Sequence, residues 1–343
     1  MADLLTQKGA EQHTQNVFDV EITKEAIYHY NRELLELLLR DRTTQKNIIW
    51  ATSDYEYLGY GYCDQDEIKV EYVARRNGNM VRPRTLKALD TKADRTRDKA
   101  EVFTPSWICN QQNNLIDRQW FGREHIFNIE TEHSWQTIQE PVEFSNEEGR
   151  TWQDYVVARR MEITCGEAPY LVSRYDTVSG EKIPVKNRIG LLDRKLRVVG
   201  ENCQTEVLWL RYARKAYQSV YGYEYQGDNL LIARINLLST FIEYYQEKFE
   251  KIPTDYWLRI IADIITWNLW QMDGLKAVVP LSCRDEIYEQ FNLFGPVRQE
   301  EECPGCRFRD IKRHNGMYCK IADWDGIKRK EITYLSLLGG GQK

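Results

Sequence analysis

The sequence predicts an α/β fold built on a parallel β-sheet. From about residue 152 onward, strand and helix patterns alternate along the 343-residue chain, which is typical of parallel strands joined by right-handed helical crossovers. Three of the predicted strands end in short turns that carry glycine or acidic residues. Because ligands bind beyond the carboxyl ends of the strands in such sheets, these turns are where a functional site is expected.

The elements of this region are predicted from hydrophobic periodicity. Helical patterns cover residues 152–160, 205–219, 227–238 and 255–261, and strand patterns cover residues 161–164, 220–225 and 264–271.

The N-terminal region predicts a helix and one further strand. The helix begins near Thr23, which can cap it, and carries an apolar stripe at helical spacing that continues to Leu38. Residues 47–52 (NIIWAT) are expected to form a short buried strand, followed by a loop rich in Tyr and Gly. The basic stretch at residues 82–99 has two interpretations, a solvated linker or helix face and a segment that contacts phosphates, and the first is favoured.

The composition excludes several classes of protein. The net charge of −5, from 47 basic and 52 acidic side chains, does not by itself indicate a nucleic-acid binder, although local basic patches matter more than the total. No apolar run approaches a membrane span and the first residues do not form a secretory signal, so a cytoplasmic protein without membrane contact is expected. The eight cysteines are then reduced thiols or metal ligands. A phosphate-binding P-loop is absent from the sequence, which argues against an ATPase.

The three strand ends carry residues suited to a nucleoside ligand. The small residues Cys165 and Gly166 follow the first strand, where a tight turn lets the backbone pass close to a ligand. Glu224 ends the second strand, where a carboxylate can accept hydrogen bonds from both ribose hydroxyls. Asp273 follows the third strand and can accept from an exocyclic adenine amine. Each feature alone is equally compatible with an ordinary turn or a helix cap, so it is their order on consecutive strands that indicates a site.

Four segments resemble a known family, the DNA amino-methyltransferases of restriction–modification systems, which methylate adenine N6 or cytosine N4. The resemblance is closest to the proteins labelled restriction endonuclease subunit M, and it spans about residues 99–275. The segments are residues 101–108 (EVFTPSWI), 162–171 (EITCGEAPYL), 220–237 (VYGYEYQGDNLLIARINL) and 268–275 (NLWQMDGL).

The resemblance implies a Rossmann-like, class I methyltransferase core that binds S-adenosylmethionine. In that family the Phe-Thr-Pro segment contacts the methionine part of the cofactor, the first strand turn surrounds it, and the second and third strand ends hold the ribose and the adenine ring. The implied positions here are Phe103, Thr104 and Pro105 for the methionine end, Glu162, Cys165, Gly166 and Ala168 for the turn, Glu224 for the ribose, and Asp273 for the adenine, with Tyr225 as a further cofactor-binding residue.

The sequence departs from the family pattern at two places. Ala168 stands where the motif has its second glycine, and no Asn-Pro-Pro-Tyr or Asp-Pro-Pro-Tyr motif occurs in the chain. In the family that second motif holds the target amine and stacks on the flipped base. A permuted order would place its equivalent at the end of the 47–52 strand, with Asp54 accepting from the amine and Tyr55 or Tyr57 stacking on the base. The alternative is an ordinary Tyr-rich loop.

A cluster of metal-ligand residues lies near the C-terminus. Cys303, Cys306, His314 and Cys319 have the spacing C-x2-C-x7-H-x4-C, which is typical of a closed tetrahedral zinc site with a structural role. The basic side chains of residues 307–313 lie between these ligands and suit phosphate contact. The alternative is a reduced loop without metal.

These observations predict three regions. Residues 1–98 form an N-terminal region that is a candidate to complete the sheet, residues 99–280 form the methyltransferase core, and residues 281–343 form a small segment like a zinc knuckle. The leading hypothesis is a DNA methyltransferase, acting on adenine N6, with DNA and a restriction nuclease or specificity subunit as partners. The alternative is a catalytically inactive relative that binds DNA or serves as a restriction subunit.

Overall fold

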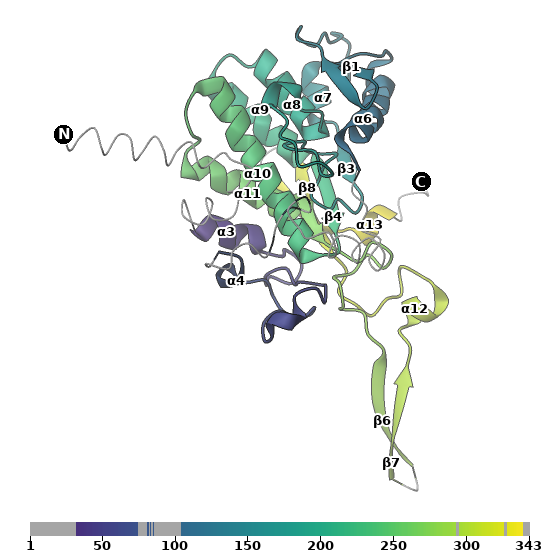
Figure 1. Ribbon diagram of the computed structural model, residues 1–343. Helices are drawn as coiled ribbons and strands as arrows, with labels where there is room; N and C mark the ends of the chain where they lie inside the picture. The colour runs from purple at the N-terminus through teal and green to yellow at the C-terminus, as the bar shows by residue number, and fades with distance from the viewer. Residues whose placement is uncertain are drawn as a thin grey trace, which may run out of the picture.

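A three-stranded parallel sheet lies at the centre of the molecule (Figure 1). The computed structural model describes residues 32–74, 81, 83, 85, 104–292, 295–325 and 328–338. The strand order is β3 (Arg160–Glu162), β4 (Val220–Glu224), β5 (Leu269–Gln271). Glu162 pairs with Gly222, and Glu224 pairs with Gln271, so the carboxyl ends of neighbouring strands lie together. The parallel pairing agrees with the expectation from sequence, and the Rossmann-like class stays a prediction.

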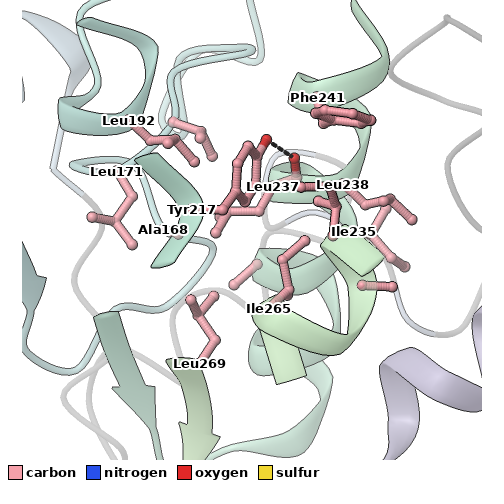
Figure 2. Packing of buried hydrophobic residues seen from close by; sticks show 14 of the residues in the cluster. Ala168, Leu171, Leu192, Tyr217, Ile235, Leu237, Leu238, Phe241, Ile265 and Leu269 are labelled. Atoms are coloured by element: carbon pink, nitrogen blue, oxygen red, sulfur yellow. Dashed lines mark hydrogen bonds between the residues drawn. The ribbon is translucent and has the colours of Figure 1, made fainter. Parts of the chain in front are cut away.

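Helices pack on one face of this sheet and form the main core. They are α7 (Trp152–Val157), α8 (Leu191–Asn202), α9 (Glu206–Gln218), α10 (Gly227–Phe249) and α11 (Asp255–Asn268). α10 is buried over most of its length and packs against α11, β4 and β5. In the core the hydroxyl of Tyr217 donates to the carbonyl of Leu237 at 2.7 Å (Figure 2), which satisfies a polar group among apolar side chains.

α11 and the third strand differ from the sequence prediction. The helix expected at residues 255–261 continues to Asn268, and the strand expected at residues 264–271 is reduced to Leu269–Gln271. A short apolar run fits a buried helix as well as a buried strand, and here Leu258, Ile261 and Ile265 face the core at helical spacing. α10 is likewise longer than the predicted 227–238, whereas α7 ends at Val157.

A second, smaller core covers the opposite face of the sheet. The antiparallel hairpin of β8 (Lys320–Asp325) and β9 (Lys328–Thr333) packs there. Side chains alternate between the faces of a strand, so Tyr221 and Tyr223 of β4 pack with Trp270 and Ile321 in this second core, while Val220 belongs to the helical core. The C-terminal segment therefore contributes directly to the packing of the sheet.

The N-terminal region docks beside β5 without forming a regular strand. It contains α3 (Arg32–Leu39), η2 (Glu56–Leu58) and α4 (Val70–Ala74). The strand expected at residues 47–52 is extended and buried at Ile48 and Trp50, but it pairs only through isolated bridges, such as Ile49 with Glu67. Its attachment to the sheet is made by Gln271, whose side-chain amide both accepts from the Ile49 N–H and donates to the Ile49 carbonyl, each at 2.9 Å.

A further unit packs against α8. It comprises α6 (Ser106–Phe121), β1 (Asn128–Thr131), β2 (Ser134–Thr137) and η4 (Val185–Asn187). The buried guanidinium of Arg194 on α8 pairs with the buried carboxylate of Asp117 on α6 at 2.5 Å and donates to Asn110 and Asn114. This satisfied ion pair fixes α6, and with it Thr104 just before the helix.

A two-stranded arm projects away from the body of the molecule (Figure 1). Its strands are β6 (Glu286–Asn292) and β7 (Gly295–Glu301), and the register pairs Glu286 with Glu301 at its base. α12 (Pro304–Phe308) follows β7, and α13 (Leu335–Leu338) follows β9. The arm begins and ends beside the cysteine cluster described below.

Candidate cofactor cavity and metal centre

A cavity of about 800 Å³ lies at the carboxyl ends of β3 and β4. Its volume is within the ordinary range for a small-molecule site. Its walls come from the turns after these two strands, from the N-terminal segment at residues 51–53, and from Thr104. The fold therefore brings together segments that are more than 150 residues apart in the sequence.

Glu162 and Glu224 place two buried carboxylates in the cavity wall. Glu162 accepts backbone N–H bonds from Tyr170 at 3.3 Å and Leu171 at 3.1 Å. Burial raises the pKa of the Glu162 carboxyl to about 8, against the opposing effect of these two N–H groups. Burial also raises the pKa of Glu224. Burial thus disfavours the ionised form of both carboxyls, and a ligand that offers hydroxyl donors or positive charge would stabilise that form.

Glu224 also connects the first two strand ends. Its Oε2 accepts from the Gly166 N–H at 2.8 Å, and its Oε1 accepts from the Gln226 N–H at 3.1 Å. The turn that contains Gly166 is tightly wound, with φ of 53° at Gly166 and 66° at Ala168. Ala168 thus adopts the left-handed conformation that favours glycine.

The structure brings most of the predicted cofactor residues to this cavity. Thr104, Glu162, Cys165, Gly166, Glu224 and Tyr225 line it. Ala168 is fully buried behind the turn, and Pro105 caps α6 without being part of the cavity wall. Phe103 lies outside the described residues.

Asp273 is not part of the cavity wall. Its Oδ1 accepts from the backbone N–H groups of Leu275 at 3.0 Å and Lys276 at 3.2 Å. The carboxylate thus caps its own turn, which is the ordinary role that the sequence also allowed.

The predicted catalytic residues do not line the cavity either. Tyr55 is buried against Trp50, with 4.5 Å between ring centroids, and its hydroxyl bonds Asp228 at 2.8 Å. The prediction that Tyr55 stacks on a base is therefore wrong, because its ring is part of the core. Tyr57 is 81% exposed on the following loop, and Asp54 comes directly after the wall residues 51–53.

Sequence reasoning missed Asp64, Gln226 and Leu281 in the cavity wall. Asp64 lies here because its carbonyl accepts from the Ala51 N–H at 2.8 Å, which closes the Tyr-rich loop. The acidic pair at residues 64 and 66, at the end of the Tyr- and Gly-rich segment, was the available signal.

Three cysteines and one histidine form a second candidate site. The ligand atoms of Cys283, Cys303, Cys306 and His314 all lie within 4.8 Å of one another and could hold a metal ion. The fourth ligand is Cys283, and the prediction of Cys319 as a ligand is wrong. Cys319 is buried in the second core, and its thiol donates to the Gln271 carbonyl at 3.4 Å. The β6–β7 arm separates Cys283 from Cys303 in sequence, so the spacing concealed this ligand.

The geometry of the cluster fits a tetrahedral ion. Cys283 Sγ lies 3.3 Å from Cys303 Sγ and 3.7 Å from Cys306 Sγ, and the His314 Nδ1 lies 3.5–3.7 Å from all three sulfurs. Four ligands around zinc, with Zn–S near 2.3 Å, would be separated by about 3.5–3.8 Å. Gly305 allows this approach, since a Cβ there would lie 2.5 Å from His314 Cγ.

Lys276 connects the metal cluster to the Asp273 turn. Burial opposes its charge, but the thiols of Cys306 and Cys283 and the carboxylate of Asp273 raise its pKa. The pKa of Tyr225 in the cavity wall is raised by burial and, to a smaller extent, by the carboxylate of Asp273. The positive charge of Lys276 lowers this pKa in turn. The charge of Lys276 thus interacts both with the cysteine cluster and with Tyr225 in the cavity wall.

No known protein family, curated protein or solved structure matches the chain. Among the helices of the described residues, none has the length and apolar character needed to cross a bilayer. The functional assignment therefore depends on the cavity and the cysteine cluster themselves.

Proposed function

We propose that this chain is an S-adenosylmethionine-dependent DNA methyltransferase that acts on an exocyclic amine, adenine N6, within a restriction–modification system. The observation that carries the proposal is the cavity at the ends of two adjacent parallel strands, with Glu162 and Glu224 in its wall and the Gly166 turn bonded to Glu224. Ligands of parallel α/β sheets bind at this edge.

The chain's own groups suit two parts of this ligand, the ribose and the methionine end. Glu224 would accept from the ribose hydroxyls, and Thr104 and Glu162 would face the methionine end, whose amine carries positive charge. S-adenosylmethionine supplies an electrophilic methyl carbon: the target amine forms the new N–C bond, the C–S electron pair returns to sulfur, and the amine loses a proton to an acceptor. Positioning of the two reactants contributes much of the rate in such a transfer.

The target amine also needs an acceptor that orients it in the cavity. Asp54 is the residue that the sequence predicts, but Asp64 and Ser53 line the cavity and Asp54 does not. We therefore assign Asp64 as the acceptor that orients the amine. Asp64→Asn should lower methyl transfer far more than the matched Asp54→Asn variant, while both should retain cofactor binding.

The cysteine cluster is proposed to hold a structural zinc ion. Three thiolates and one imidazole are the ligand set of closed zinc sites, which leave no open coordination position for catalysis. The ion would hold the base of the arm and the segment at residues 303–314.

A second candidate function is a cofactor-binding DNA subunit without catalysis, acting with a restriction nuclease or specificity subunit. The specific observation in its favour is that Asp54, Tyr55 and Tyr57 do not line the cavity, in a chain that lacks a Pro-Pro-Tyr motif. Such a protein would bind S-adenosylmethionine but transfer nothing.

One experiment separates these functions. The zinc-loaded chain is incubated with methyl-tritiated S-adenosylmethionine and amplified, unmethylated DNA of mixed sequence, with Glu224→Ala as control. Label in the DNA, identified after digestion as N6-methyladenine, supports the first proposal. Saturable cofactor binding without label in the DNA supports the second, and absence of any cofactor binding by the folded wild-type chain contradicts both.

A further inference from the structure

The segment at residues 307–313 forms an exposed basic surface, which we call the basic loop: Arg307, Arg309, Lys312 and Arg313. We infer that the basic loop, held by the Cys283–Cys303–Cys306–His314 centre, contacts the phosphates of double-helical DNA beside the cavity. The inference deepens the proposed function, since it depends on DNA as the partner, but it does not depend on methyl transfer.

The charge of the basic loop is available for a partner. All four cations are exposed, and within the described part of the chain none of them forms an ion pair with a carboxylate. Asp310 lies between them, but its Oδ1 accepts from the Lys312 backbone N–H at 2.9 Å. In a chain with a net charge of −5 this is a local concentration of positive charge, and such patches bind phosphates.

An exposed aromatic ring orders two of these cations. Phe308 is 57% exposed, and the guanidinium groups of Arg307 and Arg313 lie 5.4 and 4.8 Å from its ring centroid. Such cation–π contacts restrict long side chains before a partner arrives. The entropy lost on binding is smaller for side chains that are already restricted.

A metal ion at this centre would attach the basic loop at both ends. Cys303 and Cys306 precede the loop, and His314 follows it directly. The Gly305 carbonyl also accepts from the Asp310 N–H at 3.0 Å. Metal binding would therefore fix the orientation of the four basic side chains. Loss of the ion should weaken DNA binding.

The basic loop is also connected to the rim of the cavity. Leu281 lines the cavity and Cys283, two residues later, is a metal ligand. Arg284 donates to Gln65 at 2.9 Å, and the neighbouring Asp64 lines the cavity. DNA bound to the basic loop would thus lie where a flipped base could enter the cavity.

The neighbouring surfaces favour nucleic acid over other polyanions. The loop that Arg284 contacts carries two exposed aromatic rings, Tyr57 at 81% and Tyr60 at 96%, which suit stacking against bases. The projecting arm, by contrast, carries exposed Glu286, Glu300 and Glu301 near its base, which would repel phosphates. The DNA contact is therefore confined to the basic loop and the cavity rim.

The test measures DNA binding by the full zinc-loaded chain. Fluorescence anisotropy with a labelled 24-base-pair duplex is recorded from 50 to 300 mM NaCl for wild type and for Arg307→Gln/Arg313→Gln. The matched control is Arg123→Gln/Arg211→Gln, because these arginines are also exposed and lie over the rings of Phe121 and Tyr212. They belong to the α6–α9 end of the molecule, away from α12 (Figure 1).

The basic-loop variant should bind DNA tenfold or more weakly at 100 mM NaCl. Its slope of log affinity against log salt should fall by about 2, because each phosphate that is no longer neutralised lowers the slope by about 0.9. The control should keep both values. Unchanged affinity and slope in the basic-loop variant, or an equal reduction in the control, would overturn the inference. So would competition by poly-glutamate as effective as that by unlabelled DNA at equal charge, which would assign the surface to an acidic protein.

Cofactor binding separates this inference from the proposed function. The basic-loop variant should bind S-adenosylmethionine as wild type does, and Glu224→Ala should lose the cofactor while keeping the DNA salt slope. Methyl transfer to DNA by a basic-loop variant with a normal salt slope would overturn the inference alone. DNA binding through the basic loop, without any cofactor binding by wild type, would overturn the proposed function alone. Metal content and melting temperature confirm that each variant is folded.

Discussion

The backbone N–H of Gly166 donates to Oε2 of Glu224 at 2.8 Å, so the turn after one strand is held by the carboxylate that ends the next. The same carboxylate accepts from Gln226 and faces the cavity. One side chain thus holds the turn and also forms part of the cavity wall.

Glu224→Gln should weaken S-adenosylmethionine binding by about 10- to 100-fold, because hydrogen bonds to a charged acceptor contribute about 1.5–3 kcal/mol. Isothermal titration calorimetry measures the change. The matched control is Asp273→Asn, which should leave the affinity unchanged because Asp273 caps its own turn outside the cavity wall. Much weaker binding by the Asp273 variant together with normal binding by the Glu224 variant would reverse the two assignments.

Glu162 should make the stability of the protein depend on pH. Its pKa is raised by burial from the ordinary value of 4.5 to about 8, so the folded state holds a proton that the unfolded state releases between these values. Stability from this group is complete below about pH 4.5 and is lost as the pH rises to about 8, by at most about 1.4 kcal/mol per pH unit. Urea unfolding of wild type from pH 5 to 8.5 should show this decline.

Glu162→Gln should flatten the decline, since an amide does not titrate, whereas the exposed Glu247→Gln should leave it as in wild type. Parallel slopes for wild type and the Glu162 variant would contradict the assignment. Glu224 contributes in the same direction, so some slope should remain.

Cys283→Ser should lower the zinc content of the purified protein and its retention in the presence of a chelator, because Cys283 supplies one of four ligand atoms. Cys319→Ser should keep a full equivalent of zinc, since its thiol lies in the second core. Metal analysis by mass spectrometry checks both, and the absorption of a Co²⁺-substituted sample checks tetrahedral thiolate ligation. The opposite result would restore the ligand set predicted from sequence spacing.

Gln271→Ala should release the N-terminal segment from β5. The side chain bonds both the N–H and the carbonyl of Ile49 at 2.9 Å and the carbonyl of Tyr225 at 2.8 Å. Removal of these buried hydrogen bonds should cost about 2–4 kcal/mol of stability and speed hydrogen exchange at the Ile49 amide. Gln218→Ala is the matched control, because its buried Nε2 has no hydrogen-bond partner among the described residues. Equal destabilisation by both variants would contradict a specific docking role.

The local elements and the order of the strand ends could be predicted from the amino-acid sequence alone. The helix expected at residues 205–219 forms as α9, the central strand ends at Glu224, and the small-residue turn follows Glu162. These features depend on neighbours in the chain, through periodicity and capping, which is why the sequence predicts them. Residues 264–268, predicted as strand, are helical in the structure. A short buried apolar run does not show whether its period is that of a strand or of a helix, so the sequence could not decide between them.

Which residues share a site depended on the folded arrangement of the whole chain. Asp64 lines the cavity because a loop closes, and Cys283 lies beside Cys303 although the arm separates them in sequence. The carboxylate of Asp273 accepts from the backbone of its own turn. Tyr55 enters the core because Trp50 and Asp228 complete its packing and its hydrogen bond. These outcomes depend on contacts between residues far apart in the chain, and the spacing of residue types along a single sequence contains no measure of such distances.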